Sequence, residues 1–219
     1  MKENSTPNGG KNLRGPHGHV RGSPRNNPGF DLGDCHGLVK GVVQYRRLIG
    51  ECQHDRMPVL DPDAIARIAN ASDPSRAAIA AGREVLSQWT QFIERRVSFA
   101  IETTLAGIGP IERIRQARIA GYGVRVYYVA IDTPELNVER VRRRVLQGGH
   151  DIPERDVRRR YDRSLTNAPI VLTLADQASV LDNSFYQTVT VAEIESGSIS
   201  WRAPNVPMWA AKILAAVER

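Results

Sequence analysis

The amino-acid sequence predicts an α/β fold built on a parallel β-sheet with helices on both faces. From Pro58 onward, short runs rich in Val, Ile and Tyr alternate with longer segments of helical periodicity. This alternation is typical of parallel βαβ units, because two parallel strands need a long crossover between them. Several helical segments also begin with Asp or Thr followed by Pro, which is a common start of a helix.

The first regular elements follow Met57. Val59 and Leu60 are expected to end a strand, and Asp61-Pro62 is expected to begin a helix through DAIARIA. The same pattern at Asp73-Pro74 predicts a second helix to about Arg96, in which apolar residues recur at helical spacing. These residues are Ala77, Ala81, Val85, Trp89 and Phe92. VSFAIE is then expected to be a strand and TTLAGIG a loop.

The middle of the chain repeats this cycle. Pro110 opens a predicted helix through IERIRQARIA, which Gly121 ends. GVRVYYVAI has the strongest strand character in the chain, with almost no polar break. Thr133-Pro134 then begins a helix that Gly148-Gly149 ends.

The last third is expected to hold two helices and several short strands. Pro153 begins a helix through DVRRRYDRSL, and SVLDNS and YQTVTVAEI are predicted strands. ESGS predicts a turn into SISWRA, and PMWAAKILAAVER predicts a closing amphipathic helix.

Residues 1–57 differ in composition from the rest, so we expect an irregular, disordered or non-native segment there and a single domain over residues 58–219. This first segment holds both cysteines, four of the five histidines and many Gly, Pro and Asn residues. Only GLVKGVVQYRRLIG is expected to form a short element. A zinc site made of Cys35, His36, Cys52 and His54 is a minor alternative, because the adjacent Cys-His pair does not fit finger spacing. Without an apolar span or leader, we expect a cytoplasmic protein and no membrane partner.

The net charge is +6, and most of the 30 basic residues are arginine. Arginine matches phosphate oxygens bidentately, although a compositional bias of the genome also produces such an excess. A basic RNA-binding protein is the competing class. Aromatic residues make up only 6% of the chain, so the stacking surfaces typical of that class are not indicated and nucleic acid is not an expected partner.

Four polar motifs fall at expected strand ends or in the following loops: LDPDAIA, IETTLAG, RVRRRVLQGGHDIPERDVRRRY and LDNS. In α/β sheets, ligands bind beyond the carboxyl ends of the strands. Each motif alone is weak evidence, since an Asp at a helix start is usually a cap and an arginine run is usually a solvated face.

Together and in this order, these motifs resemble the zeta toxin family of small-molecule kinases over about residues 58–184. The most specific parts are AGREVL, SFAIETTLAG, GGHDIPERDVRRRYDRSLTN and LDNS. The resemblance implies a P-loop kinase-like fold with an Arg-rich helical lid. It also implies ATP and Mg²⁺, a UDP-activated amino sugar such as UDP-N-acetylglucosamine as acceptor, and an antitoxin protein as a possible partner.

The resemblance also implies roles for individual residues. Asp63 matches the carboxylate that deprotonates the sugar hydroxyl, with Asp61 as the neighbouring candidate and more probable cap. Glu102, Thr103 and Thr104 match the residues that bind the substrate.

The arginines match a lid over the triphosphate, where they would offset developing charge. Arg144 and Arg159 are assigned to catalysis, and Arg158 and Arg160 to nucleotide binding. Consecutive helical residues point about 100° apart, so only some of Arg158 to Arg160 can face one ligand. His150 and Asp151 are expected to shape the lid.

The phosphate-binding loop of the family, GPNGxGKST, is not intact in this sequence. The nearest match is Thr6 to Asn12, in which Gly9, Gly10 and Lys11 are assigned to the nucleotide and Asn12 replaces the hydroxyl that binds magnesium. In the family, a buried strand of about five or more apolar residues precedes this loop. Only Met1 to Ser5 precede it here, so we expect the N-terminal strand and the P-loop to be poorly formed. A frameshifted or mis-started gene would explain this, and an inactive remnant that binds substrate or antitoxin is the alternative function.

Overall fold

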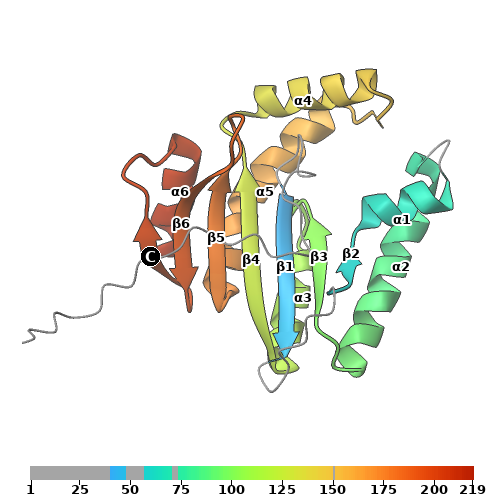
Figure 1. Cartoon of the computed structure of the whole chain (residues 1–219), viewed down its shortest axis with the longest axis horizontal. Coiled ribbons are helices and arrows are strands. Elements are labelled where there is room, and N and C mark those ends of the chain that lie inside the picture. The colour runs from blue at the N-terminus through green and yellow to red at the C-terminus, as the bar shows by residue number, and fades with distance from the viewer. Residues whose placement is uncertain (1–39, 48–56, 71–73, 150) are drawn as a thin grey trace, which may run out of the picture. The chain divides into compact units, whose positions relative to one another are not determined.

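The computed structural model describes residues 40–47, 57–70, 74–149 and 151–219, which form one seven-stranded sheet and six helices (Figure 1). The strands lie in the order β2-β3-β1-β4-β5-β6-β7. Their bounds are β1 Lys40–Arg47, β2 Val59–Leu60, β3 Phe99–Thr103, β4 Tyr122–Ala130, β5 Gln177–Asp182, β6 Val189–Glu195 and β7 Ser198–Arg202. The α/β class and the kinase-like arrangement are therefore confirmed.

Four strands of the sheet, β2, β3, β4 and β5, run in the same direction, as predicted. β2 pairs with β3 and β4 pairs with β5 in parallel, while β6 and β7 extend the sheet as antiparallel strands. The carboxyl ends of the four parallel strands therefore lie at one edge of the sheet, where a ligand site is expected.

The central position of the sheet is taken by β1, which runs antiparallel to both of its neighbours. Gly41 lies opposite Thr103 of β3 and Tyr128 of β4, and Tyr45 lies opposite Phe99 and Val124. The short element expected around residues 37–50 is thus a strand. It begins at the carboxyl edge of β3 and β4 and ends at their amino edge, so the chain leaves this strand on the side away from the ligand edge.

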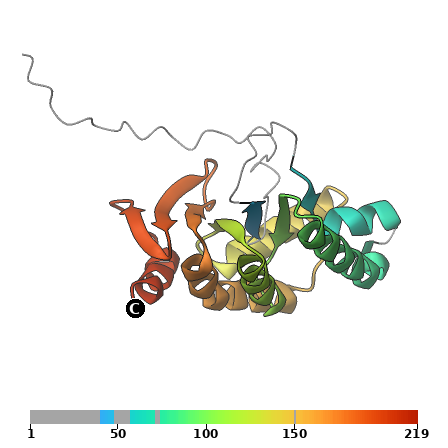
Figure 2. The ribbon, with the colours of Figure 1, turned by 90° about the horizontal axis from the view of Figure 1, so that it is seen from below.

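The helices pack mainly on one side of the sheet. Their bounds are α1 Pro62–Ala69, α2 Pro74–Glu94, α3 Gly109–Ile119, α4 Pro134–Leu146, α5 Glu154–Leu174 and α6 Met208–Val217. Figure 2 shows α3, α5 and α6 below the strands, and no helix of the described residues covers the centre of the opposite side. The sequence predicts helices on both faces. The described helices instead lie mainly on one face.

The core lies between the helix-facing side of the strands and these helices. Phe99, Val126 and Tyr128 are buried in this core. The ring of Phe99 lies 5.2 Å from that of Phe92 of α2, and the ring of Tyr128 lies 6.3 Å from that of Trp209 of α6. On β4 every second residue from Tyr122 to Ala130 is buried, since alternate strand residues face the same side. Burial of these residues supplies the main driving force for folding.

Two predicted helix starts, at Asp61 and Thr133, are confirmed by their capping contacts. The Asp61 carboxylate accepts a hydrogen bond of 2.8 Å from the backbone N–H of Asp63, and the Thr133 hydroxyl accepts one of 3.2 Å from Leu136. Helix α5 instead continues past its predicted end to Leu174, with Pro169 inside it. Ala168, Val171 and Leu172 are fully buried there, and this packing outweighs the single backbone hydrogen bond that a proline removes.

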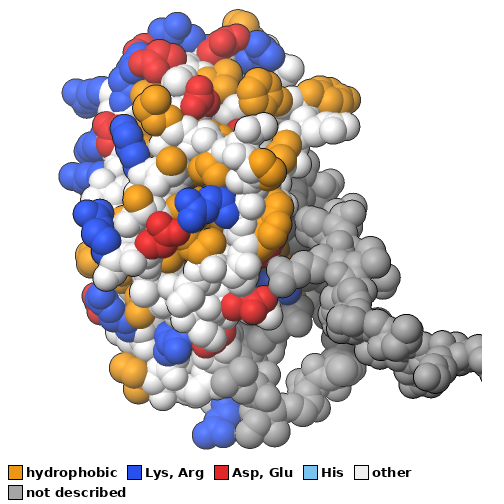
Figure 3. Space-filling view, turned by 90° about the vertical axis from the view of Figure 1, so that its left-hand side faces the viewer, with side chains coloured by type: hydrophobic (Ala, Val, Ile, Leu, Met, Phe, Trp, Pro, Cys, Tyr) orange, Lys and Arg blue, Asp and Glu red, His pale blue; other side chains and the backbone are white. Residues whose placement is uncertain are grey.

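The end of the molecule formed by β6, β7 and α6 carries mixed charges. Figure 3 shows basic and acidic side chains interspersed with hydrophobic ones on this face, and Arg202 of β7 pairs with Glu218 at 2.7 Å. A nucleic-acid surface is typically dominated by basic residues, which this face is not. Among the described helices, none has the length and apolar character needed to span a bilayer.

Candidate active site

A pocket of about 310 Å³ opens at the carboxyl edge of β2 and β3. The two strands end at Leu60 and Thr103, and the chain continues from each into the wall of the pocket. The lining residues are Asp61, Pro62, Asp63, Val85, Ile101, Glu102, Thr103, Thr104, Arg113 and Arg160. The site therefore combines carboxylates, hydroxyls and guanidinium groups from five elements or their ends.

Five of the residues selected from the sequence line this one pocket. They are Asp63, Glu102, Thr103, Thr104 and Arg160. Asp63 comes from the start of α1, the next three from the end of β3, and Arg160 from α5. The fold thus brings together residues almost 100 positions apart in the sequence, and this grouping is the basis for treating the pocket as the candidate active site.

Asp61 and Asp63 differ in what their carboxylates do. Asp61 caps α1 through the backbone N–H of Asp63 and also lies 3.8 Å from Arg67. Asp63 is exposed at the pocket rim, within the first turn of the same helix. The capping role therefore belongs to Asp61, and the Asp63 carboxylate is the better placed to accept a proton from a ligand.

The loop after β3 is held in an unusual conformation. Thr103 accepts a hydrogen bond of 3.2 Å from the backbone N–H of Leu105, and Leu105 has a φ of 53°, in the left-handed region. From α5, Asn167 donates to the carbonyl of Leu105 at 2.7 Å and more weakly to that of Gly107 at 3.4 Å. Strained residues of this kind persist only where the surrounding structure fixes them, and they are common at binding sites.

Asn167 lies in the GGHDIPERDVRRRYDRSLTN motif, and the sequence assigns no site role to it. It is half-buried and does not line the pocket itself. Its hydrogen bonds instead fix the loop that carries Thr103 and Thr104. No local sequence pattern identifies such a role, because the contact joins residues 62 positions apart.

Arg113 is a second residue that the sequence did not indicate. It lies one turn into α3, is half-buried and lines the pocket. A Cβ atom at Gly109 would lie only 3.2 Å from the Arg113 Nη2, so glycine at that position leaves room for the guanidinium group. Its proximity to the polar lining residues follows from the fold and not from any motif.

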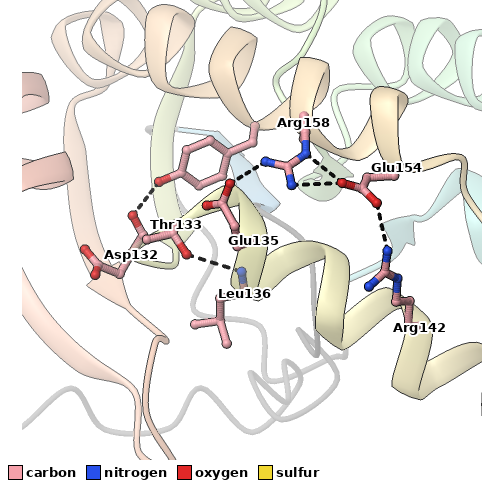
Figure 4. Close-up of polar contacts among 8 residues, drawn as sticks. Asp132, Thr133, Glu135, Leu136, Arg142, Glu154 and Arg158 are labelled. Carbon is pink, nitrogen blue, oxygen red and sulfur yellow. Dashed lines mark hydrogen bonds and ion pairs between the residues drawn. The ribbon is translucent and has the colours of Figure 1, made fainter.

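The four arginines assigned to the lid differ in their environments. Arg158 of α5 forms ion pairs with Glu135 of α4 and with Glu154, and Glu154 also binds Arg142 at 2.8 Å (Figure 4). The hydrogen bond from Arg158 lowers the pKa of both glutamates, and these bonds raise the pKa of Arg158 itself. Arg158 therefore ties α4 to α5 and does not line the pocket.

The other arginines of the lid are placed as follows. Arg159 is exposed and pairs with Asp156 at 3.0 Å, whereas Arg160 points to the pocket, as expected for consecutive helical residues. Arg144 is half-buried at the end of α4, where its carbonyl accepts a hydrogen bond of 2.9 Å from Gly149. Asp151 lines a smaller pocket of about 110 Å³ between α4 and α5. His150, Gly9, Gly10, Lys11 and the Cys-His group considered for zinc lie outside the described residues.

The LDNS motif forms a turn that joins three elements. Asp182 accepts hydrogen bonds from the backbone N–H and the hydroxyl of Ser184, which in turn accepts one of 2.8 Å from Asp132. Arg140 of α4 donates to the carbonyls of Asn183 and Ser184 at 2.7 and 3.1 Å. The motif thus fixes the first turns of α4 to the carboxyl ends of β4 and β5.

Tyr161 strengthens the same region from α5. Its hydroxyl donates to the carbonyls of Ile131 and Asp132 at 3.1 and 2.8 Å, and the second contact is drawn in Figure 4. Burial raises the pKa of this phenol to about 12, so it remains a hydrogen-bond donor at neutral pH. The base of the lid is therefore rigidly attached to the sheet.

No group of three or more His, Cys, Asp or Glu side chains in the described part of the chain is arranged to hold a metal ion. Magnesium in phosphotransferases is bound mainly by phosphate oxygens and water, with few protein ligands. The donor set of the pocket is compatible with a metal that enters with a triphosphate.

The fold and the site define the class of kinase-like α/β proteins with a polar pocket at the carboxyl edge of the sheet and an Arg-rich pair of helices, α4 and α5, beside it. A family model described as Zeta toxin matches residues 57–195, and the chain belongs to this family of P-loop kinase-like phosphotransferases. An uncharacterized protein of Haemophilus influenzae is 37% identical over 103 residues, which are 47% of this chain and 74% of that protein. No solved structure matches the chain at a significant level.

Proposed function

We propose that this protein transfers the γ-phosphoryl group of ATP to a hydroxyl of a UDP-activated amino sugar such as UDP-N-acetylglucosamine. The observation that supports this most directly is the single pocket lined by Asp63, Glu102, Thr103, Thr104 and Arg160. It combines a candidate base, polar groups suited to sugar hydroxyls and a cation suited to phosphate. Its position at the carboxyl ends of β2 and β3 is typical of ligand sites in α/β sheets.

In the proposed reaction, Asp63 accepts the proton of the attacking sugar hydroxyl as the oxygen–phosphorus bond forms. The bond between the γ-phosphorus and the oxygen that bridges it to the β-phosphate breaks, and ADP leaves with the bonding electrons. Glu102, Thr103 and Thr104 orient the sugar, and Arg160 offsets the negative charge on the transferred group.

The remaining roles are also part of the proposal. Arg144 and Arg159 assist catalysis when the lid closes, and Arg158 reaches the nucleotide only if its contacts with Glu135 and Glu154 rearrange. Gly9, Gly10 and Lys11 hold the phosphates, and Mg²⁺ is bound with the triphosphate. A cytoplasmic location and an antitoxin that blocks the pocket belong to the same hypothesis.

A second candidate is a protein that binds the acceptor or an antitoxin without transferring phosphate. The direction of β1 favours it. A phosphate-binding loop normally follows the central parallel strand and precedes a helix. Here the central strand is antiparallel, and the chain that follows it leaves at the opposite edge.

Two measurements separate these functions. Thermal unfolding is followed with ATP and Mg²⁺ and, separately, with UDP-N-acetylglucosamine, and transfer is followed by ³¹P NMR with both ligands present. For the phosphotransferase we expect both ligands to raise the unfolding temperature and a sugar phosphate to form. Stabilisation by the sugar nucleotide alone, without turnover, would support the acceptor-binding protein. No response to either ligand contradicts both phosphoryl transfer and acceptor binding. Asp63→Asn is the control, expected to bind ligands but not to turn over.

A further inference from the structure

We propose that Glu135 and Glu154 compete with the phosphates of the nucleotide for Arg158, so that this arginine exchanges carboxylate partners for a phosphate group when the nucleotide binds. The inference deepens the proposed function and rests on it, because it concerns the regulation of nucleotide binding. It gives a role to two glutamates outside the set of candidate site residues.

The guanidinium group of Arg158 is engaged by carboxylates on both of its sides. Its Nε and Nη2 atoms donate to one oxygen of Glu154 at 2.9 and 2.8 Å, and its Nη1 atom donates to Glu135 of α4 (Figure 4). These are the donors that a bidentate phosphate contact uses. A phosphate group can therefore bind Arg158 in this way only by displacing at least one of the glutamates.

The network lies close to the edge of the sheet where ligands bind. Glu135 is in the first turn of α4, the helix that follows β4. On α5, the hydroxyl of Tyr161 bonds the carbonyls of Ile131 and Asp132, which directly follow β4. Arg158 precedes Tyr161 by three residues, which is about 4.5 Å along a helix. Arg158 is therefore near the carboxyl end of β4, at the edge expected to receive a ligand.

The exchange of partners costs little free energy because the contacts are exposed. The side chains of Arg158, Glu135 and Glu154 are 40%, 63% and 43% exposed. Exposed ion pairs contribute little to stability, whereas a phosphate group carries more charge and accepts two parallel hydrogen bonds. Glu154 also keeps a second partner, Arg142 at 2.8 Å, when Arg158 leaves. The ion pair lost outright is that of Glu135, the most exposed of the three.

The contact between α4 and α5 does not depend on this network alone. Val138 and Val141 of α4 are buried together with Val157 of α5 in a small cluster of their own. This apolar contact remains when Arg158 changes partner. The exchange therefore requires rotation of side chains and not separation of the two helices.

The test measures how removal of the competing carboxylates changes affinity for the nucleotide. Binding of ATP with Mg²⁺ and, separately, of inorganic tripolyphosphate to the full chain is measured by isothermal titration calorimetry. Glu135→Gln/Glu154→Gln should bind both ligands about 2- to 10-fold more tightly than the unaltered protein, which is the range of exposed ion pairs. Tripolyphosphate lacks the nucleoside, so a gain for both ligands identifies the phosphates as the competing group.

The matched control is Glu112→Gln/Glu139→Gln. Glu112 pairs with Arg115 on α3 and Glu139 pairs with Arg143 on α4, so the control removes the same charge from two other exposed ion pairs. It should leave both affinities within about twofold, because exposed charges away from the ligand are screened by salt.

Adding Arg158→Gln to Glu135→Gln/Glu154→Gln should abolish the gain, because the guanidinium group for which the carboxylates compete is then absent. A gain that survives this third substitution, or that the control reproduces, is a general effect of charge and overturns the competition. Unchanged affinity of Glu135→Gln/Glu154→Gln also overturns it if the unaltered protein binds ATP, and the proposed function then stands.

Failure of the proposed function has a different signature. If neither the unaltered protein nor any variant binds ATP or tripolyphosphate, phosphoryl transfer and the competition are both contradicted. If thermal unfolding shows that Glu135→Gln/Glu154→Gln does not fold, Glu135→Gln decides, because Arg158 then keeps its contact with Glu154. The absence of any gain in affinity in that variant overturns the inference.

Discussion

The side-chain amide of Asn167 donates a hydrogen bond of 2.7 Å to the main-chain carbonyl of Leu105, a residue with left-handed backbone conformation at the edge of the candidate site. Replacing Asn167 by Ala leaves this part-buried carbonyl without its donor, which typically costs about 1–3 kcal/mol. We therefore expect lower unfolding free energy in urea and an acceptor affinity reduced by about tenfold.

The matched control for this change is Thr166→Ala. The Thr166 hydroxyl bonds only within its own helix, to the carbonyl of Asp162, and does not contact the loop. Thr166→Ala should therefore leave the affinity for the acceptor unaltered. Equal effects of the two substitutions on affinity would show that Asn167 does not position Thr103 and Thr104.

Substitutions of Asp61 and Asp63 should affect different properties, the first mainly stability and the second mainly phosphoryl transfer. Asp61→Ala removes the cap of α1 and should lower the free energy of unfolding by about 1 kcal/mol, as lost caps typically do. Asp63→Asn should lower the free energy of unfolding by less, because that carboxylate lies in the first turn of the helix but does not cap it. It should reduce phosphoryl transfer by about 100- to 10,000-fold if it is the general base. Denaturant titrations and turnover assays of both variants measure this, and a larger loss of turnover in Asp61→Ala would reverse the assignment.

The ion pairs of Arg158 should make the contact between α4 and α5 sensitive to acid. The fold lowers the pKa of Glu135 and Glu154 below their ordinary value of 4.5, mainly through hydrogen bonds from Arg158. Their contribution is therefore fully present above that value and is lost as the pH falls through the lowered folded values.

The variant Arg158→Gln tests this dependence. Its unfolding temperature should lie below that of the unaltered protein at neutral pH, and the difference should shrink as the pH falls below 4.5. High salt should also reduce the difference, because the pairs are partly exposed. A difference that is constant from pH 7 to 2 would contradict a role for these pairs.

Substitution by Ala should change the free energy of unfolding in opposite directions at two glycines. A Cβ atom at Gly149 would lie 2.6 Å from the Arg144 Cγ and 2.8 Å from the Arg144 carbonyl oxygen, so Gly149→Ala should destabilise the end of α4 by about 1–3 kcal/mol. Gly82 lies inside α2 with nothing within 4 Å of the added atom, so Gly82→Ala should stabilise by about 0.5–1 kcal/mol. Urea unfolding measures both, and destabilisation by Gly82→Ala would contradict the open environment found there.

Much of the local structure follows directly from short-range chemistry in the sequence. Asp61 and Thr133 cap their helices, as expected from their position before Pro. The apolar spacing of Ala81, Val85 and Trp89 matches their burial in α2. In these places local preference and tertiary packing favour the same structure.

The features that were missed depend on contacts between distant residues. The helix predicted through DVRRRYDRSL continues past Pro169 to Leu174, where Ala168, Val171 and Leu172 are buried. The direction of β1 has no local indicator, because alternation of side chains is the same whichever way a strand runs. Arg113 and Asn167 act at the site only because α3 and α5 pack beside the end of β3.

Only part of the candidate site could be predicted, because some of its residues are marked by their place after a strand and others are placed by contacts between distant residues. Asp63 and the residues after β3 were identifiable because each lies at the carboxyl end of a strand, where the fold class places ligands. The three consecutive arginines Arg158 to Arg160 could not be distinguished from the sequence. Arg158 pairs with Glu135 and Glu154, whereas Arg160 lines the pocket. The packing of the helices against one another decides which arginine does which.

The antiparallel β1 shows that structural integrity and phosphate chemistry place different demands on the centre of this sheet. Backbone N–H and C=O groups of β3 and β4 require only a strand between them, and a strand of either polarity satisfies them. A phosphate-binding loop, by contrast, requires a strand that arrives at the ligand edge. The pocket on β2 and β3 therefore does not depend on the direction of the central strand, whereas a phosphate-binding loop does.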